Sequence, residues 1–243
     1  MRYHALIPAA GNGSRFRGDS PKQYWMLAGK PVLVHSVERL SAAFPLAEIH
    51  VAIATSDRWY DPVIGARPGV TPLRCGGATR GETVRNALSM LGDARDDDWV
   101  LIHDAVRPCV DLRALARLRD ELAGDAIGGL LALPVVGTLK RANADGRSGA
   151  TEPREGLWNA QTPQMFRFGV LRAALARSDA THCTDEAQAV EALGLAPSLV
   201  TGDPTNLKIT YPDDLTLAAA IMAAQQRALD VTGAPPAIRE RAA

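Results

Sequence analysis

A run of small residues near the N-terminus, followed by two cationic side chains, is the segment best suited to chemistry. Residues 8–16 read PAAGNGSRF, and PKQ follows at 21–23. Consecutive free backbone N–H groups form a concave site for an anion, and small side chains let a ligand approach them. Arg15 and Lys22 would bring positive charge to that anion, Arg by binding two oxygens and Lys as a point charge. The small residues of this predicted phosphate loop are Pro8, Ala9, Ala10, Gly11 and Gly13.

Two better-known phosphate-binding patterns do not fit this loop. Gly11 and Gly13 are followed by Phe16 where the dinucleotide fingerprint has its third glycine. Gly18 is followed by Asp-Ser and not by the Lys-Ser/Thr of the P-loop. A flexible glycine-rich turn with two solvated cations is the plain structural alternative.

A second polar position follows the apolar segment 99–103. Asp104 would stand at the carboxyl end of a strand, where open α/β sheets bind ligands. The alternative is that Asp104 only caps the turn leading to Pro108. His103 would face the other side of the strand, where we expect packing or support. Cys109 has no base partner in the sequence that would make it a nucleophile.

The elements that must position these residues alternate between apolar and amphipathic segments. Strands are predicted at 3–8, 49–54, 69–74, 99–103, 129–136, 198–201 and 207–210. Helices are predicted at 31–43, 82–91, 112–122, 166–177, 184–193 and 212–229, with Thr184 as an N-cap. Strands separated by helices favour an α/β fold, a three-layer α/β/α sandwich around a Rossmann-like, mostly parallel sheet. Such sheets bind ligands at the carboxyl ends of their strands, here the loops after Ile7, Arg74 and Ile102.

Residues 137–158 interrupt this alternation. The segment has little apolar content and contains Asp145-Gly146, a strong hairpin turn signal. An isolated two-stranded hairpin is marginal in water, so we expect a β-arm that packs on the same arm of a second subunit. Residues 1–231 are then one domain carrying this arm, and 232–243 are predicted to be a flexible tail.

The composition excludes several classes of protein. Twenty-seven basic residues balance twenty-seven acidic ones, which argues against a general nucleic-acid binder. The longest apolar stretches are about half the length of a membrane span, so no membrane partner is expected. The N-terminus enters the glycine-rich loop too early for a signal peptide. Three widely spaced cysteines without a CxxC pair predict reduced thiols in a cytoplasmic protein.

Seven groups of residues, taken in order, give a more specific indication. They are PAAGNGSRF with PKQY, Gly76-Gly77 with Arg80 and Thr83, HDAVRP at 103–108, TLK at 138–140, Arg154 with Gly156-Leu157-Trp158, TPQ at 162–164, and TDE at 184–186 with NLKIT at 206–210. This series resembles the 2-C-methyl-D-erythritol 4-phosphate cytidylyltransferase family, up to about residue 227.

The resemblance implies a nucleotidyltransferase-type fold and a reaction. The family joins the cytidylyl group of CTP to the phosphate of 2-C-methyl-D-erythritol 4-phosphate and releases pyrophosphate, in the non-mevalonate route to isoprenoids. It uses Mg²⁺ as a cofactor. Because Mg²⁺ prefers oxygen ligands, Asp104 would be the natural carboxylate to bind it. The family is also a homodimer whose arm reaches the partner's active site.

The resemblance also implies roles for particular residues. Arg15 and Lys22 match the pair that stabilises the transition state, and Arg154 and Lys208 match the pair that positions the sugar phosphate. The matched nucleotide pocket comprises Ala9, Ala10, Gly76, Gly77 and Thr83. Further positions lining the substrate site are Asp104, Ala105, Arg107, Thr138 and Thr162. Thr138 and Arg154 would act in trans. Pro153 departs from a regular arm because it removes a backbone donor.

Two other functions stay open from the sequence. One is a cytidylyltransferase for another polyol phosphate, such as ribitol 5-phosphate, which shares the first loop and differs in the arm and acceptor pocket. The other is a nucleotide-binding module without catalysis. The presence of Arg15, Lys22, Arg154 and Lys208 counts against it, because binding alone would not need four cations. Plain readings also exist for single residues: Lys208 as an exposed strand lysine, Arg154 as an ordinary surface charge, and 184–186 as a helix cap.

Overall fold

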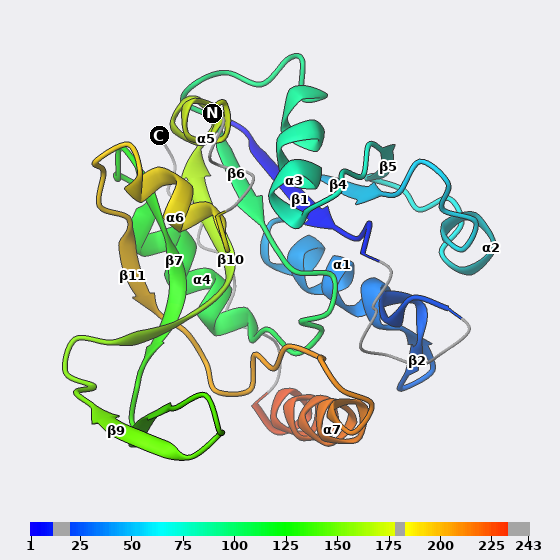
Figure 1. Cartoon of the computed structure of the whole chain (residues 1–243). Coiled ribbons are helices and arrows are strands. Elements are labelled where there is room, and N and C mark those ends of the chain that lie inside the picture. The colour runs from blue at the N-terminus through cyan, green and yellow to red at the C-terminus, as the bar shows by residue number, and fades with distance from the viewer. Residues whose placement is uncertain (12–19, 178–182, 233–243) are drawn as a thin grey trace.

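The computed structural model of the chain describes residues 1–11, 20–177 and 183–232. Within these residues, seven strands form one sheet in the order β11-β7-β10-β6-β1-β4-β5 (Figure 1). Their bounds are β1 Tyr3–Pro8, β4 Glu48–Ile53, β5 Val70–Arg74, β6 Trp99–Ile102, β7 Gly128–Pro134, β10 Trp158–Arg167 and β11 Ser198–Thr201. β10 runs antiparallel to both of its neighbours, and the other pairs are parallel. The predicted mostly parallel sheet is confirmed.

Helices cover both faces of the sheet, because each presents an apolar stripe to it. On one face, α1 (Val32–Ala43) and α4 (Leu112–Leu122) pack with the side chains of one core cluster. On the other face, α3 (Arg80–Ser89), α5 (Phe168–Leu175) and α6 (Glu186–Glu191) pack with a second cluster. The three-layer α/β/α sandwich is therefore confirmed.

The helix starts follow ordinary capping chemistry. Asp111 accepts a hydrogen bond from the Arg113 N–H at 2.7 Å and caps α4. Thr79 accepts one from the Glu82 N–H at 3.1 Å and caps α3. Such caps satisfy backbone donors that the first helical turn leaves open. α3 thereby begins two residues earlier than predicted and carries Arg80 as its first residue.

Smaller elements complete the described chain. A 3-10 turn, η1 (Lys22–Tyr24), precedes a two-stranded sheet of β2 (Met26–Leu27) and β3 (Lys30–Pro31), and α2 (Tyr60–Val63) follows β4. The predicted arm contains a hairpin of β8 (Leu139–Ala142) and β9 (Ser148–Glu152). α7 (Asp214–Thr232) lies against a third apolar cluster with Leu27, Val106 and Ile209. None of the helices described is both long and apolar enough to cross a bilayer.

Three sequence predictions about these elements are wrong. β10 includes Phe166 and Arg167, which were predicted to begin a helix, and its antiparallel insertion was not foreseen. Residues 207–210 form no strand. The Ile209 N–H donates to the Val106 carbonyl oxygen at a distance of 2.9 Å, and this bond is not part of the sheet. Asp185, not Thr184, caps α6, accepting from the Gln188 N–H at 2.9 Å. The predicted tail lies almost wholly outside the described residues.

Candidate active site

A cavity of about 450 Å³ opens at the carboxyl edge of the sheet. The loops after β1, β5 and β6 meet there, together with η1 and the segment that carries Lys208. Its lining residues are Pro8, Ala9, Ala10, Gly11, Lys22, Gln23, Gly77, Ala78, Thr79, Arg80, Thr83, Asp104, Ala105, Val106 and Lys208. Most of the predicted substrate residues that the structure describes therefore surround one space.

The first loop is held in place by a glutamine that follows Lys22. Gln23 is buried and donates its side-chain N–H to the Ala9 carbonyl at 2.7 Å and to the Gly11 carbonyl at 3.2 Å. The Ala9 N–H itself bonds the Ala52 carbonyl at the end of β4, at 2.7 Å. Gln23 thereby fixes the start of the phosphate loop. Gln23 belongs to the PKQ motif at 21–23, but the motif alone does not indicate that its side chain holds the first loop.

A glycine pair brings the loop after β5 against the first loop. A Cβ at Gly76 would lie 2.6 Å from the Ala10 Cβ and 2.9 Å from the Ala54 Cα, so only glycine allows this approach. The Gly77 N–H donates to Thr83 Oγ1 at 3.0 Å, and Thr83 is buried. Thr83 thus shapes the backbone of the pocket wall from the first turns of α3.

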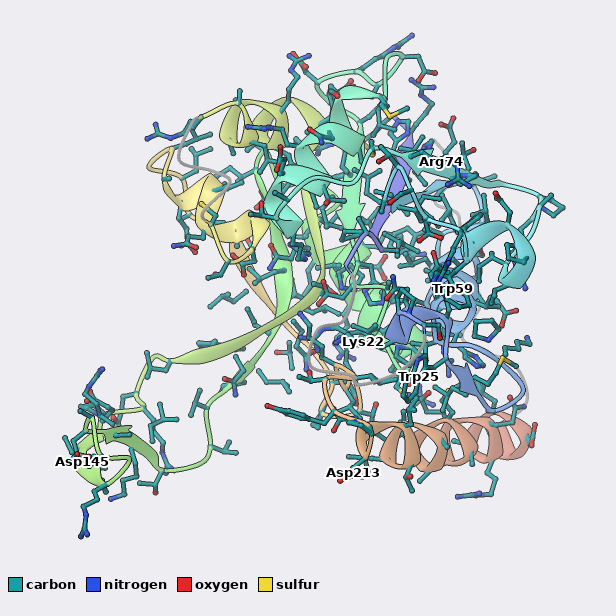
Figure 2. All side chains as sticks on the ribbon, turned by 45° about the vertical axis from the view of Figure 1, so that its right-hand side comes forward. Lys22, Trp25, Trp59, Arg74, Asp145 and Asp213 are labelled. Atoms are coloured by element: carbon teal, nitrogen blue, oxygen red, sulfur yellow. The ribbon has the colours of Figure 1, made fainter. Side chains whose placement is uncertain are left out.

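Two lysines from distant parts of the chain converge on the cavity. Lys22 Nζ donates to the Ile209 carbonyl at 2.8 Å. The preceding residue, Lys208, places its Nζ 2.8 Å from Asp104 Oδ2. Figure 2 shows Lys22 on the main body of the molecule, far from the tip of the arm at Asp145. Because residues 206–210 do not join the sheet, the Ile209 carbonyl is available to Lys22, which thereby lies near Lys208.

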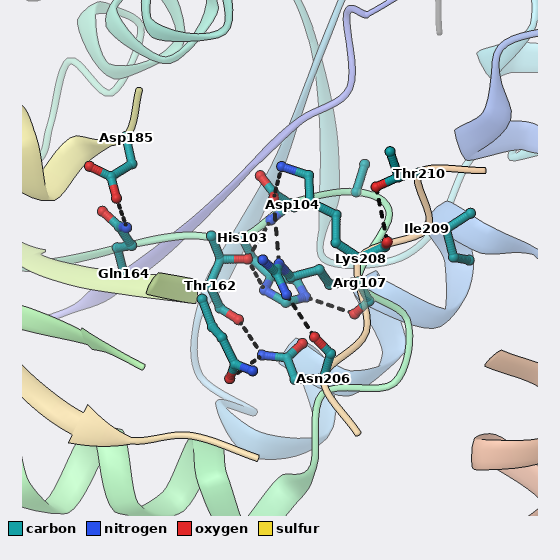
Figure 3. A network of polar contacts seen from close by, with 12 residues as sticks. His103, Asp104, Arg107, Thr162, Gln164, Asp185, Asn206, Lys208, Ile209 and Thr210 are labelled. Atoms are coloured by element: carbon teal, nitrogen blue, oxygen red, sulfur yellow. Dashed lines mark hydrogen bonds and ion pairs between the residues drawn. The ribbon is translucent and has the colours of Figure 1, made fainter. Parts of the chain in front are cut away.

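Asp104 stands among three cationic side chains. Its Oδ1 lies 3.1 Å from Arg80 Nε, and its Oδ2 lies 2.8 Å from Lys208 Nζ and 3.5 Å from Arg107 Nε. Burial by itself would raise the pKa of Asp104, but the charges of Arg80, Lys208 and Arg107 outweigh it and hold the pKa well below its usual range. Asp104 is therefore a fixed negative charge beside these cations, and Figure 3 shows Lys208 and Arg107 near it.

Arg80 is tied to a second carboxylate, from α6. Its Nη1 and Nη2 meet Glu186 Oε1 and Oε2 at 2.6 and 3.1 Å, a bidentate pair. Glu186 is 1% exposed. Burial raises its pKa, and the Arg80 charge opposes that shift. The sequence predicted only a helix cap at 184–186, because nothing local shows that Arg80 will meet the first residue of α6.

A chain of hydrogen bonds links β6 to β10 behind Asp104. Thr162 Oγ1 accepts from the Asp104 N–H at 3.0 Å and lies 3.1 Å from His103 Nδ1. His103 Nε2 lies 3.1 Å from the Arg107 carbonyl oxygen. Since a carbonyl only accepts, His103 carries its proton on Nε2, and Thr162 donates to Nδ1. Burial lowers the pKa of His103 to about 4, so the ring is neutral and supports the site.

Arg107 and Thr162 line a smaller cavity of about 150 Å³ that also has Arg80, Asp104 and Lys208 in its wall. Arg107 Nη1 donates to the Asn206 carbonyl at 2.7 Å, and the Asn206 side chain donates to the Thr162 carbonyl at 2.8 Å. The two cavities share Arg80, Asp104 and Lys208. The structure thus brings Arg107 and Thr162 to the far side of Asp104.

Two predicted residues lie elsewhere. Thr138 and Arg154 are exposed residues at the base of the hairpin, and the Arg154 side chain bonds the Val136 carbonyl. Figure 2 shows the arm, with Asp145 at its tip, reaching away from the body that holds Lys22. Neither residue lines the cavity of its own chain. Gly13 and Arg15 lie outside the described residues.

The arrangement does not fit a preformed Mg²⁺ site on Asp104. Both carboxylate oxygens already contact cations, and a metal ion would have to compete with Lys208 and Arg80 for them. No other carboxylate lines the larger cavity among the residues described. Three cations around one carboxylate suit a polyanionic ligand instead.

Comparison with known proteins gives a consistent result. The sequence model of the family described as 2-C-methyl-D-erythritol 4-phosphate cytidylyltransferase matches residues 3–224. A protein of that name from Dechloromonas aromatica is 51% identical over 228 residues, covering 93% of this chain and 99% of its own. One from Laribacter hongkongensis is 54% identical over 219 residues, covering 90% and 95%.

Solved structures agree with these relatives. A crystal structure of 4-diphosphocytidyl-2C-methyl-D-erythritol synthase has a TM-score of 0.81 at 41% identity, covering 91% of this chain and 98% of the other. A 2-C-methyl-D-erythritol 4-phosphate cytidylyltransferase from Francisella tularensis has a TM-score of 0.79 at 33% identity, covering 91% and 100%. The range that the family model matches, residues 3–224, includes the strands of the sheet, the lining of the cavity and the arm.

Proposed function

This chain belongs to the 2-C-methyl-D-erythritol 4-phosphate cytidylyltransferase family, and we propose that the cavity between β1, β5 and β6 is the site of its reaction. The chain is a nucleotidyltransferase of the non-mevalonate route to isoprenoids. It transfers the cytidylyl group of CTP to 2-C-methyl-D-erythritol 4-phosphate. The products are 4-diphosphocytidyl-2-C-methyl-D-erythritol and pyrophosphate.

The observation that best supports placing the reaction in this cavity is that Lys22 and Lys208 both line it. In the reaction, a phosphate oxygen of the acceptor attacks the α-phosphorus of CTP. A new P–O bond forms, the bond to the β-phosphate bridging oxygen breaks, and pyrophosphate leaves with that electron pair. Two anions must approach each other, so positioning and positive charge can supply the catalysis without a covalent nucleophile.

The surroundings of Lys22 support a role on the reacting phosphates. Its anchor at the Ile209 carbonyl sets the ammonium beside the first loop, whose backbone would hold the nucleotide phosphates. Arg15, from the same loop, is proposed to share this task on the strength of the motif. Ala9, Ala10, Gly76, Gly77 and Thr83 form the small-residue wall proposed for the base and ribose.

Lys208 is proposed to bind the acceptor phosphate. Its ammonium lies 2.8 Å from Asp104 Oδ2 and its side chain is 46% exposed, so an arriving phosphate can reach it. Arg154 and Thr138 are proposed to complete this subsite from the arm of a second chain. Their exposure on an arm that points away from their own cavity supports a homodimer.

Magnesium is proposed to enter as the Mg²⁺ complex of CTP, because the triphosphate offers hard oxygen ligands, whereas the Asp104 carboxylate in the cavity wall is already paired with cations. Addition of a chelator is then expected to abolish turnover, and excess Mg²⁺ to restore it. We place the reaction in the cytoplasm, in keeping with the free thiols of Cys75, Cys109 and Cys183.

The function is tested by pyrophosphate release from CTP and Mg²⁺, with and without 2-C-methyl-D-erythritol 4-phosphate. Release that depends on the acceptor, with formation of the diphosphocytidyl product by mass spectrometry, is the expected result. Tight CTP binding without any release would favour a non-catalytic nucleotide-binding module.

A further inference from the structure

Two histidines and a glutamate meet at the amino ends of the strands, the edge of the sheet opposite the cavity. His4 is the second residue of β1, and Glu48 and His50 belong to the first half of β4. The parallel register pairs His4 with Glu48. Because side chains alternate along a strand, Glu48 and His50 lie on the same face of the sheet as His4. The sheet itself therefore builds this cluster.

The ring nitrogens of this cluster lack hydrogen bonds. His4 is completely buried, yet neither Nδ1 nor Nε2 makes a hydrogen bond, and the same holds for both ring nitrogens of His50. Instead, His4 Nδ1 and His50 Nε2 point to one carboxylate oxygen, Glu48 Oε2, at 3.4 and 3.7 Å. Buried polar atoms without a hydrogen bond are rare in native proteins, and a bound ion or an ordered water molecule can satisfy them.

The spacing fits a tetrahedral metal ion. With zinc–ligand bonds of about 2.0–2.1 Å, two ligand atoms of a tetrahedron lie about 3.3 Å apart. The two measured separations from Glu48 Oε2 are close to this value, and one ligand atom from each of the three residues lies within 4.8 Å of the others. Imidazole nitrogens with a carboxylate suit Zn²⁺ and similar transition metals, not Mg²⁺.

A buried aspartate stands behind His4. Asp98 is 1% exposed by its side chain and lies 3.8 Å from His4 Nε2, the nitrogen on the far side of the ring from Glu48. The backbone N–H groups of Arg2 and Arg95 hold Asp98 at 2.6 and 2.9 Å. A carboxylate that faces the second nitrogen of a histidine is the usual support of a metal-bound imidazole.

The local charge also favours a divalent cation. Glu48, Asp93 and Asp98 bring three carboxylates, and Arg2 contacts all three. One guanidinium against three carboxylates leaves a deficit of two positive charges. Arg2 lies 3.8 Å from Glu48 Oε1, on the other oxygen from the one the histidines face. The Glu48 side chain is half exposed, which gives an ion and a water molecule access.

We propose that His4, Glu48 and His50 bind one transition-metal ion of the zinc class, with water as the fourth ligand. The ion would join the amino ends of β1 and β4 and act on stability, away from the reaction. It is separate from the magnesium that accompanies the nucleotide, because its donors are imidazoles and it lies at the other edge of the sheet.

The full-length chain, stripped with a chelator and kept free of nucleotide, is titrated with Zn²⁺ at neutral pH. We expect one equivalent to bind and the melting temperature to rise with Zn²⁺ concentration. Co²⁺ in place of Zn²⁺ should give the visible absorption of a four-coordinate ion with nitrogen and oxygen ligands. An intense thiolate-to-cobalt band would instead place the ion on cysteine and overturn the proposal.

Two ligand variants and one matched control locate the site. Glu48→Gln and His50→Gln should weaken Zn²⁺ binding by about tenfold or more. Glu38→Gln removes a similarly exposed carboxylate that pairs with Lys30, and should bind Zn²⁺ like the wild type. The Glu48 side chain is half exposed, so its variant should melt normally without metal. Equal Zn²⁺ affinity in Glu48→Gln and wild type, or no stoichiometric binding at micromolar Zn²⁺, would overturn the proposal.

Discussion

Lys22, Lys208 and Asp104 form the proposed anion site of a chain whose formal net charge is zero. Asp104 holds Lys208 at 2.8 Å and Arg80 at 3.1 Å, and Lys22 is anchored one residue away from Lys208. Preorganised charges of this kind cost little reorganisation when the transition state forms. The proposed role of these cations is therefore to lower the barrier of the reaction, which the variants below test.

Lys22→Ala is expected to lower kcat roughly a hundredfold or more while changing the Kd for CTP by less than about threefold. The reason is that its proposed contact strengthens as charge builds up on the transferring phosphate. Steady-state pyrophosphate release and CTP titration by calorimetry measure the two quantities. Lys30→Ala, which removes a surface lysine paired with Glu38, serves as control. A loss of CTP affinity as large as the loss of kcat would contradict the role.

Glu186→Gln is expected to lower the free energy of unfolding by about 3 kcal/mol, because it leaves the Arg80 guanidinium without its bidentate partner in a buried place. Urea unfolding at neutral pH measures the change. Glu191→Gln alters an exposed residue of the same helix and should be neutral. If both variants unfold at the same urea concentration as wild type, the pair contributes nothing to stability.

His103 gives the fold a pH dependence of known sign. Burial lowers its pKa from 6.5 to about 4. Between these values the unfolded chain binds a proton and the folded chain does not, so the free energy of unfolding falls as pH falls through this window. The maximal loss from this group is about 3 kcal/mol. Urea unfolding at several pH values should show a shallower slope in His103→Asn, and identical slopes would refute the prediction.

At the scale of elements, β10 supports the cavity from behind, and the arm carries residues proposed to bind the acceptor. β10 brings Thr162 against β6, and a register irregularity between Ala160 and Gln164 accompanies the polar residues that bond the site. The hairpin that precedes β10 carries Arg141 and Glu152 as a cross-strand ion pair of 2.6 Å. The arm is therefore structured in a single chain, although its proposed substrate residue lies at its base.

Arg154→Ala is expected to raise the KM for 2-C-methyl-D-erythritol 4-phosphate at least about tenfold and to leave CTP binding unchanged, because one charged contact to the acceptor phosphate is removed. Arg141→Ala provides a matched control, since it removes an exposed arm arginine that pairs within the hairpin. Initial rates at varied acceptor concentration distinguish the two. An equal KM for both variants would separate Arg154 from the acceptor.

The sequence predicted the elements whose pattern is local and missed those that depend on distant partners. The apolar strands β1, β4, β6 and β11 and the capped helix α4 were found by their periodicity. β10 was missed because its buried half contains Gln161, Thr162 and Gln164, which look unlike a strand until their hydrogen bonds are known. Glu186 was taken as an ordinary capping acid for the same reason.

The candidate site divides in the same way. Lys22, Asp104 and Lys208 were found through motifs, and the structure places them at one cavity. The roles of Gln23 and Glu186 were missed. Gln23 bonds the first loop and Glu186 pairs with Arg80, and neither contact can be recognised from the neighbouring residues in the sequence. The roles proposed for Arg15, Arg154 and Thr138 stay predictions.

At the scale of the whole molecule, we propose that the arm completes each active site with residues of a second chain. If each site combines Lys22 of one chain with Arg154 of the other, mixing Lys22→Ala and Arg154→Ala proteins should restore part of the activity. At equal amounts, roughly a quarter of wild-type activity is expected from random exchange, since half of the dimers are mixed and each has one intact site. No recovery after demonstrated subunit exchange would show that both residues serve one chain.

The most direct test of the central claim compares acceptors. The account predicts that kcat/KM for pyrophosphate release is at least about a hundredfold higher with 2-C-methyl-D-erythritol 4-phosphate than with ribitol 5-phosphate, because the pocket around Lys208 and Asp104 must recognise the branched polyol. A preference for ribitol 5-phosphate would keep the nucleotide site and contradict the assignment of the acceptor.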